Sequence, residues 1–105
     1  MKTPVTQSSG NVFADIGMPN PEEHLIKAEL VHRIAAIIEA EGMKQADTAE
    51  RLGIAQPDVS KMLNGNFRQF SVERLMRFLV ALGHDVEIVV RAAKPRKRAA
   101  QITVA

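Results

Sequence analysis

The pattern of apolar and polar residues between Gln45 and Gly65 predicts two short helices joined by a tight turn at Gly53. Gly53 follows the last apolar position of the first helix, where a left-handed backbone is usual and is cheap only for glycine. Pro57 falls in the first turn of the second helix, where its missing N–H group is not needed. The positions expected to face a common core are Ala46, Ala49, Leu52, Ile54, Val59, Met62 and Leu63.

Longer amphipathic segments flank this pair of helices. Residues 20–23 (Asn-Pro-Glu-Glu) combine a cap, a helix-starting proline and acidic side chains, and they open a helix that should run to about Glu41 and stop at Gly42. After a loop at residues 66–70, Ser71 caps a further helix that ends at Gly83. The expected inner faces are Leu25, Ala28, Val31, Ile34, Ala35 and Ile38 in the long helix, and Leu75, Phe78, Leu79 and Leu82 in the last one.

Residues 85–91 have an apolar side chain at every second position, which predicts a β-strand that buries one face. A strand needs a hydrogen-bonding partner, and the chain has no second convincing strand. We therefore expect it to pair with its copy in a homodimer; pairing with residues near 12–16 is the alternative. Antiparallel pairing centred on Val89 sets Glu87 opposite Arg91 of the other copy, which contributes roughly 0.2–1 kcal/mol per pair. The expected dimer strand is Val86, Glu87, Ile88, Val89, Val90 and Arg91.

Three regions are expected along the chain: a flexible N-terminal arm of residues 1–19, a domain of residues 20–91 that holds the helices and the strand, and a basic disordered tail of residues 92–105. The arm carries a small apolar cluster, with a single helical turn expected from Asn11. This cluster either packs on the chain's own long helix or covers a protein partner and folds on binding. Its members are Val12, Phe13, Ile16 and Met18.

Composition narrows the class of protein. With 105 residues, 46% of them hydrophobic, the chain can bury one modest core, which dimer contacts would help to stabilise. It has no cysteine for a disulfide or a metal site, and His24, His32 and His84 lack metal-ligand spacing. We expect no cofactor and no enzymatic activity, because no nucleophile with a base, paired carboxylates or phosphate-binding glycine loop is evident. The apolar runs are too short for a membrane span or a signal peptide, so a cytoplasmic location is expected.

The net charge of +2 is unevenly distributed. Five of the 14 basic residues lie between positions 91 and 98, so nine basic residues stand against 12 acidic ones elsewhere. Bulk basicity therefore does not indicate DNA binding, and the argument for DNA depends on residues 45–65. The five clustered basic residues are Arg91, Lys94, Arg96, Lys97 and Arg98.

The helix pair resembles a known motif. The register of its residues is similar to the helix-turn-helix of the phage-repressor-like (XRE) family, and the flanking segments 11–38 and 70–90 resemble small antitoxins of the HigA type. Ala55 departs from the family pattern, which has Ser or Thr as the cap of the second helix, and such a cap is typically worth about 1 kcal/mol. The matching residues are Gln45, Ala49, Gly53, Ile54, Gln56, Val59, Ser60, Asn64 and Gly65.

The resemblance implies a mainly α fold, a lambda-repressor-like bundle of four to five helices, to which the predicted C-terminal β-strand adds a dimer contact. It also implies a sequence-specific DNA-binding transcriptional regulator that recognises a palindromic operator as a homodimer. Within that class, the resemblance implies an antitoxin that neutralises a RelE/HigB-like toxin and represses its own operon. Two alternatives remain open. One is a solo XRE-type repressor without a toxin partner. The other is a protein-binding module that has lost DNA affinity, which the missing cap at Ala55 and the acidic Asp58 would favour.

In such folds the second helix of the motif enters the major groove with its N-terminal residues at the base edges. The Gln56 carboxamide can pair with adenine N6 and N7, and Lys61 can reach guanine O6 and N7 or a phosphate. The resemblance implies that Gln45 contacts a phosphate and also bonds to Gln56. The expected base contacts are Gln56, Pro57, Ser60 and Lys61, and the expected phosphate contacts are Lys44, Gln45, Asn64, Asn66 and Arg68.

Overall fold

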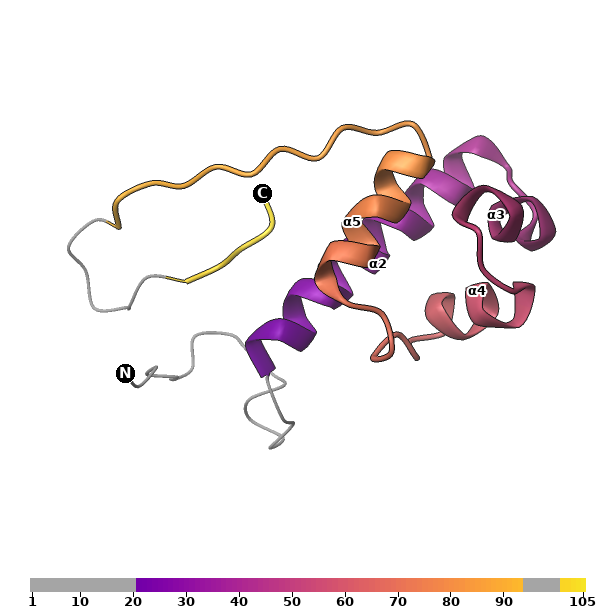
Figure 1. The fold of residues 1–105 in the computed structure, drawn as a ribbon, viewed down its shortest axis with the longest axis horizontal. Helices are drawn as coiled ribbons and strands as arrows, with labels where there is room; N and C mark the ends of the chain where they lie inside the picture. The colour runs from indigo at the N-terminus through magenta and orange to yellow at the C-terminus, as the bar shows by residue number, and fades with distance from the viewer. Residues whose placement is uncertain (1–20, 94–100) are drawn as a thin grey trace.

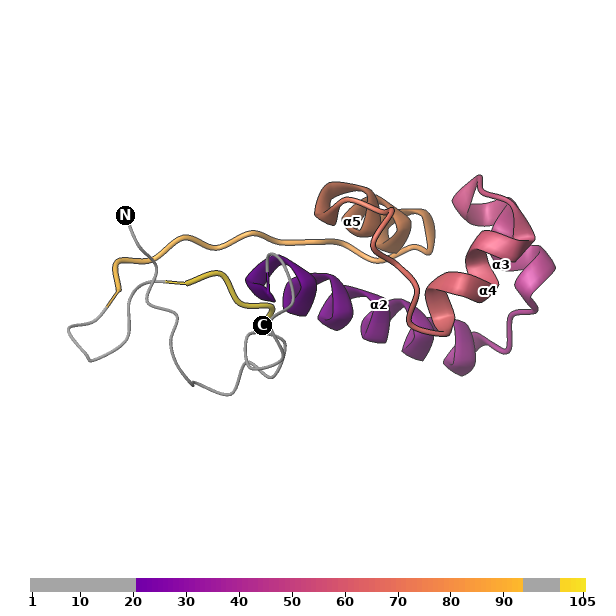
Figure 2. The same cartoon turned by 90° about the horizontal axis from the view of Figure 1, so that it is seen from below.

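The computed structural model describes residues 21–93 and 101–105, and this part of the chain contains four helices. They are α2 (Pro21–Glu41), α3 (Gln45–Leu52), α4 (Gln56–Leu63) and α5 (Val72–Ala81). Figures 1 and 2 show α5 lying along α2, with α3 and α4 packed together toward the end of α2. The expected arm, its helical turn at Asn11, the cap at Asn20 and the basic residues from Lys94 to Arg98 lie outside the described residues.

The four helices bury one core, as the sequence pattern predicts. In α5 the four expected core residues are all buried, and α4 contributes Val59 and Met62, which are both 0% exposed. None of the four helices is both long and apolar enough to cross a lipid bilayer. The buried apolar side chains are Ile26, Leu30, Val31, Ile34, Ile38, Ala49, Leu52, Val59, Met62, Phe67, Phe70, Leu75, Phe78, Leu79 and Leu82.

The expected inner face of α2 was partly wrong. Val31, Ile34 and Ile38 are buried as expected. In the first half of α2, however, the buried side chains are spaced four residues apart from Ile26, on the side of the helix along which α5 lies. Ala46 of α3 was also wrongly assigned to the core and is exposed. Three residues of α2 that were expected in the core are only half-buried: Leu25, Ala28 and Ala35. Three others that were not expected there are buried: Ile26, Lys27 and Leu30.

Thr48 takes the buried position in α3 that the pattern of apolar residues could not indicate. Its side chain is 0% exposed, and its hydroxyl donates a hydrogen bond of 3.0 Å to the carbonyl oxygen of Lys44. Because this bond satisfies the hydroxyl within its own helical turn, the residue can lie in the core without an unpaired polar atom.

The predicted helix ends that fall within the described residues are confirmed. Gly53 has a left-handed backbone with φ of 73°, and its N–H donates to the carbonyl oxygen of Ala49 at 2.8 Å. The Ser71 hydroxyl accepts a hydrogen bond of 3.0 Å from the backbone N–H of Arg74 at the start of α5. Pro57 lies in the first turn of α4, and Ala55 precedes that helix without a side-chain cap. These ends depend on local sequence, which explains why they could be predicted.

Two phenylalanines anchor the loop between α4 and α5. Phe67 and Phe70 are buried, although the sequence pattern indicated only a loop at residues 66–70. The Phe67 ring stacks on His24 of α2, with ring centroids 4.9 Å apart, and Phe70 meets Phe78 of α5 edge-on at 5.3 Å. The loop after α4 is therefore fixed against both long helices.

The predicted C-terminal β-strand is not confirmed, since residues 21–93 and 101–105 contain no strand. The chain instead leaves α5 as an extended segment of residues 84–93 that turns back past α5 and extends beyond the helices (Figure 1). Val86 packs partly on the core, but Ile88 is 74% exposed and Val90 is 91% exposed. A strand requires a hydrogen-bonding partner, and the described part of the chain supplies none for the backbone of residues 85–93.

The last five residues, within the region expected to be a disordered tail, lie against the first half of α2. Val104 is half-buried and packs on the core. The backbone N–H of Ile102 donates to the Glu22 carboxylate at 3.1 Å, and the Arg33 guanidinium donates to the carbonyl oxygen of Ala105. Residues 101–105 thus make both apolar and polar contacts with the helix.

The stack of His24 on Phe67 predicts a specific pH dependence of stability. Burial lowers the pKa of His24 below its ordinary value of 6.5, and the positive charges of Arg68 and Lys27 lower it further. The unfolded chain then binds a proton more readily than the folded one, so this contribution to stability falls as the pH drops through 6.5. We expect His24→Gln to flatten the decrease in the free energy of unfolding between about pH 7 and pH 5.

Urea unfolding at several pH values measures this effect. His32→Gln is the matched control, because His32 lies exposed on the same helix. It should keep the wild-type pH dependence. A His24→Gln variant with the wild-type slope would contradict the prediction.

Candidate DNA-binding interface

The face of α4 that points away from the core carries the residues predicted to contact bases. Val59 and Met62 are fully buried, and they fix the rotation of the helix about its axis. Gln56, Pro57 and Lys61 are consequently exposed together, and Ser60 between them is half-buried. The structure therefore brings all four predicted base-contacting residues to one side of α4.

The polar groups on this face make few contacts with the rest of the protein. The Asn64 amide donates to the Ser60 hydroxyl at 3.5 Å, one helical turn away. The hydrogen bond that the resemblance implied between Gln45 and Gln56 is not formed among the described residues. The Gln56 amide therefore keeps both its donor and its acceptor available to a ligand.

The N-terminal end of α4 is open. Ala55 precedes the helix with an extended backbone and has no side chain that could accept a bond from the first N–H groups. Asp58 lies in the first turn and is half-buried, where its charge favours the positive end of the helix dipole. The N-terminus of α4 therefore has a polar surface, but no side chain caps its first N–H groups.

The residues predicted to contact phosphates lie on two flanks of α4. Lys44 and Gln45 start α3 and are both exposed; the Lys44 carbonyl accepts bonds from the Thr48 amide and hydroxyl, which fix the backbone there. The other flank follows α4, where the backbone N–H of Asn66 donates to the carbonyl oxygen of Lys61 at 2.8 Å. The exposed residues of this second flank are Asn64, Asn66 and Arg68.

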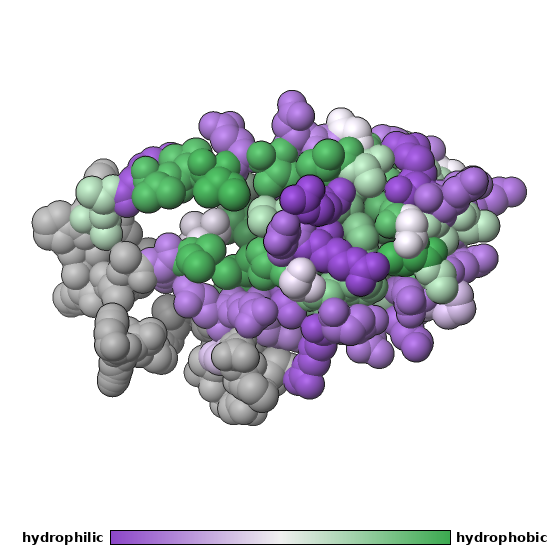
Figure 3. Space-filling model, in the orientation of Figure 1, coloured by the Kyte–Doolittle hydropathy of each residue, from purple (hydrophilic) through white to green (hydrophobic). Residues whose placement is uncertain are grey.

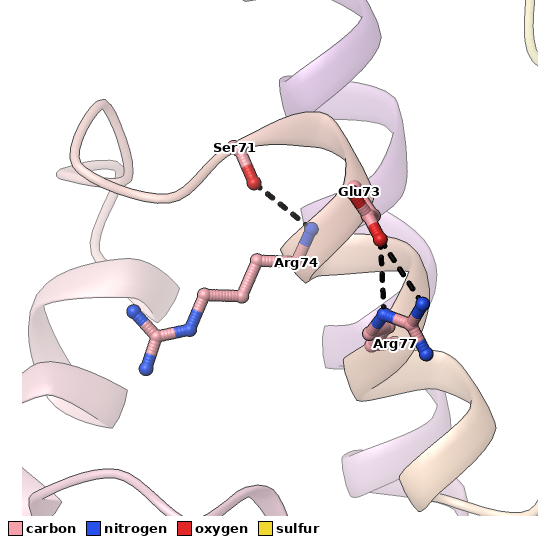
Figure 4. Close-up of polar contacts among 4 residues, drawn as sticks. All are labelled: Ser71, Glu73, Arg74 and Arg77. Carbon is pink, nitrogen blue, oxygen red and sulfur yellow. Dashed lines mark hydrogen bonds and ion pairs between the residues drawn. The ribbon is translucent and has the colours of Figure 1, made fainter.

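Two further arginines were given no DNA role from the sequence and make long-range contacts in the fold. Arg51 donates from Nε to the carbonyl oxygen of Ala81 at 3.3 Å, which ties α3 to the end of α5. The Arg74 guanidinium lies 5.2 Å from the centroid of the Phe70 ring. Figure 4 shows Arg74 extending away from the ion pair of Arg77 with Glu73, in which the two charged atoms are 3.0 Å apart. Only the tertiary structure reveals that Arg74 lies beside the loop after α4.

The histidines do not form a metal site in the part of the chain that is described. His24 is half-buried against Phe67, whereas His32 and His84 are exposed. Residues 21–93 and 101–105 hold no group of three His, Cys, Asp or Glu side chains placed to bind a metal ion.

Comparison with known proteins gives the family. Residues 12–91 match a family described as a helix-turn-helix domain. A solved structure named "Putative XRE Family Transcriptional Regulator" is 45% identical to this chain and superimposes with a TM-score of 0.78, covering 83% of this chain and 98% of that one. This chain belongs to the XRE family of helix-turn-helix transcriptional regulators. The predicted membership is thus confirmed, and with it the mainly helical DNA-binding fold.

This XRE-family regulator also resembles a curated protein of Mycobacterium tuberculosis (strain ATCC 25618 / H37Rv) named "Putative antitoxin HigA3". The two are 37% identical over 68 residues, which is 64% of this chain. The matched region spans 62% of the length of that relative.

Proposed function

We propose that this XRE-family regulator recognises a palindromic operator as a homodimer, represses transcription, and acts as an antitoxin against a RelE/HigB-like toxin. The observation that carries the DNA-binding part is the exposed polar face of α4, held outward by the burial of Val59 and Met62 and flanked on both sides by exposed polar or basic residues.

In this proposal α4 lies in the major groove. The Gln56 amide pairs with adenine, the Pro57 ring contacts a thymine methyl group, and Lys61 reaches guanine O6 and N7. Ser60 is less exposed and is held by Asn64, so it contributes a hydroxyl only to a base that approaches closely. Each good bidentate pairing contributes about 1–3 kcal/mol of discrimination between bases.

The two flanks hold the DNA backbone on either side of the groove. Lys44 and Gln45 contact one strand, and the three exposed residues after α4 contact the other. These contacts give affinity and orientation without reading the sequence, so their strength falls with salt concentration. The second group is Asn64, Asn66 and Arg68.

The extended segment after α5 is the proposed dimer contact. Residues 84–93 leave backbone groups without partners in the described chain, and Figure 3 shows hydrophobic side chains gathered along this segment. Val86, Glu87, Ile88, Val89, Val90 and Arg91 would pair antiparallel with the same residues of a second copy. In the register centred on Val89, Glu87 faces Arg91 of the other copy on both sides of the two-fold axis.

The antitoxin role is supported by the similarity to the mycobacterial relative, whose name describes it as an antitoxin. A solo repressor is the second candidate, because the more similar solved structure is named only as a transcriptional regulator. A protein-binding module without DNA affinity is less well supported, since the uncapped Ala55 and the half-buried Asp58 leave the exposed face of α4 intact.

Removal of the Gln56 amide should reduce specificity. We expect Gln56→Ala to weaken binding to the operator by about 1–3 kcal/mol while affinity for random DNA stays close to that of the wild type. Electrophoretic mobility shifts with a fragment of the protein's own promoter and with a random fragment measure both affinities. Gln101→Ala removes an exposed amide far from α4 and serves as the control; equal losses on both DNA fragments would refute direct readout by Gln56.

Interruption of the strand should separate the dimer. Proline cannot donate to a strand ladder, so Val89→Pro should shift the protein toward monomer and weaken binding to a two-half-site operator. Sedimentation velocity and mobility shifts measure the two effects. Ala93→Pro lies in the same extended segment but outside residues 86–91, and it should remain dimeric. If Val89→Pro sediments as an unchanged dimer, the interface lies elsewhere, for example on α5 at Arg74 and Arg77.

The toxin partner can be tested genetically. In the antitoxin case, a neighbouring reading frame encodes a small basic RelE-like ribonuclease, and co-expression of this protein restores growth to cells that produce the ribonuclease. Gln56→Ala should still restore growth, because α4 contacts DNA and not the toxin in this proposal. Failure of the wild-type protein to restore growth would leave the solo repressor as the function.

A further inference from the structure

Lys27 is a buried charged residue on the inner face of α2. Its side chain is 11% exposed, and its ammonium group makes two polar contacts. Nζ donates a hydrogen bond of 3.2 Å to the backbone carbonyl oxygen of Arg68, which lies 41 positions later in the chain. The same Nζ lies 3.4 Å from the Glu23 carboxylate one helical turn earlier, and that carboxylate is half exposed.

The carbonyl that Lys27 holds belongs to the loop after α4. On either side of it, Phe67 and Phe70 are buried in the core, while the Arg68 side chain between them is exposed. Within the described residues the Arg68 guanidinium forms no hydrogen bond or ion pair, although its carbonyl is fixed. The backbone at Arg68 is therefore fixed from the protein side, and its guanidinium is free to meet an external anion.

A second contact from the same face of α2 reinforces this arrangement. His24 lies three residues before Lys27, and its ring stacks on Phe67, the residue before Arg68. Residues three apart on a helix lie on one face, so the first turns of α2 hold two successive loop residues, one by its ring and one by its carbonyl.

Stability alone does not require a charge at position 27. The neighbouring buried positions of α2 are Ile26, Leu30 and Val31, and the ion-pair partner Glu23 is half exposed. An apolar residue of similar volume at position 27 would therefore leave no buried charge without a partner. What only Lys27 supplies at this position is a long donor that reaches the Arg68 carbonyl.

We propose that Lys27 is a positioning residue for DNA binding, which fixes the carbonyl of Arg68 and so directs the Arg68 guanidinium toward a backbone phosphate. This inference rests on the proposed phosphate contact of Arg68. Lys27 itself is buried and does not touch the DNA. It acts through the peptide group that joins Arg68 to Gln69, at a distance from the base-reading face of α4.

The test compares Lys27→Met, Arg68→Ala and the double variant. Methionine keeps the length and volume of lysine but removes the donor, so Lys27→Met should keep the wild-type melting temperature. We expect it to weaken operator and random DNA binding about three- to tenfold and to lower the slope of log K against log salt by up to about one unit, as Arg68→Ala does. Glu23→Gln is the control: it removes the ion pair but keeps the Lys27 donor, and it should bind DNA as the wild type does.

The double variant separates an effect through Arg68 from an effect of the lysine charge itself. If Lys27 acts through Arg68, the double variant loses no more affinity than Arg68→Ala alone; additive losses would overturn the inference. The amide ¹⁵N shift of Gln69, which shares a peptide group with the Arg68 carbonyl, should move in Lys27→Met and stay unchanged in Glu23→Gln. Lys27→Arg retains a donor, so it should bind DNA nearly as the wild type does. Lys27→Leu removes the donor as methionine does, and it takes the place of Lys27→Met if that variant does not fold.

The outcomes distinguish this inference from the proposed function. If Arg68→Ala weakens binding but Lys27→Met binds as the wild type does, the positioning role of Lys27 is wrong and the phosphate contact stands. If Arg68→Ala leaves affinity and salt slope unchanged, the phosphate contact itself is wrong, and the role of Lys27 falls with it.

Discussion

The burial of Val59 and Met62 is the constraint on which the rest of the proposed DNA-binding face depends. The helix α4 has only eight residues, and a helix of that length is not stable in water without tertiary packing. Its two buried side chains supply that packing and at the same time fix its rotation about its axis. The exposed positions Gln56, Pro57 and Lys61 therefore point outward as a geometric consequence of core packing, and no contact among themselves is needed to hold them there.

The two flanks of the proposed interface also depend on packing and turns within the fold. The left-handed turn at Gly53 sets α3 against α4 and so places Lys44 and Gln45 on one side. On the other side, the loop after α4 has no regular structure of its own, and its shape comes from buried rings and from the donor of Lys27. The first turns of α2 thus act on the surface around α4 although they lie outside the helix-turn-helix itself.

The features that could be predicted from the sequence are those determined by residues close together along the chain. The turn at Gly53, the cap at Ser71 and the proline in the first turn of α4 follow from local backbone preferences, and the structure confirms each of them. The contacts of Lys27, His24 and Phe67 join residues about 40 positions apart, so no local pattern could indicate them. The inner face of α2 was partly misassigned for the same reason, because the direction from which α5 approaches selects the buried row. The strand at residues 85–91 is a different case, since its hydrogen-bonding partner belongs to no described part of a single chain.

In the proposed dimer, the extended segment matters to DNA recognition as much as α4 does. In the proposed complex one α4 makes two or three base contacts. At about 1–3 kcal/mol each, they supply roughly 2–9 kcal/mol, compared with the roughly 4–10 kcal/mol by which specific sites are preferred over random DNA. Two copies on a palindrome double the discrimination, provided that they are joined rigidly enough to meet both half-sites at once. The exposed side chains of Ile88 and Val90 gain by burial against a second copy, and an unpaired apolar edge would otherwise favour aggregation. In the proposed dimer, the antiparallel pairing of residues 86–91 would therefore give both specificity for a full operator and protection of this edge.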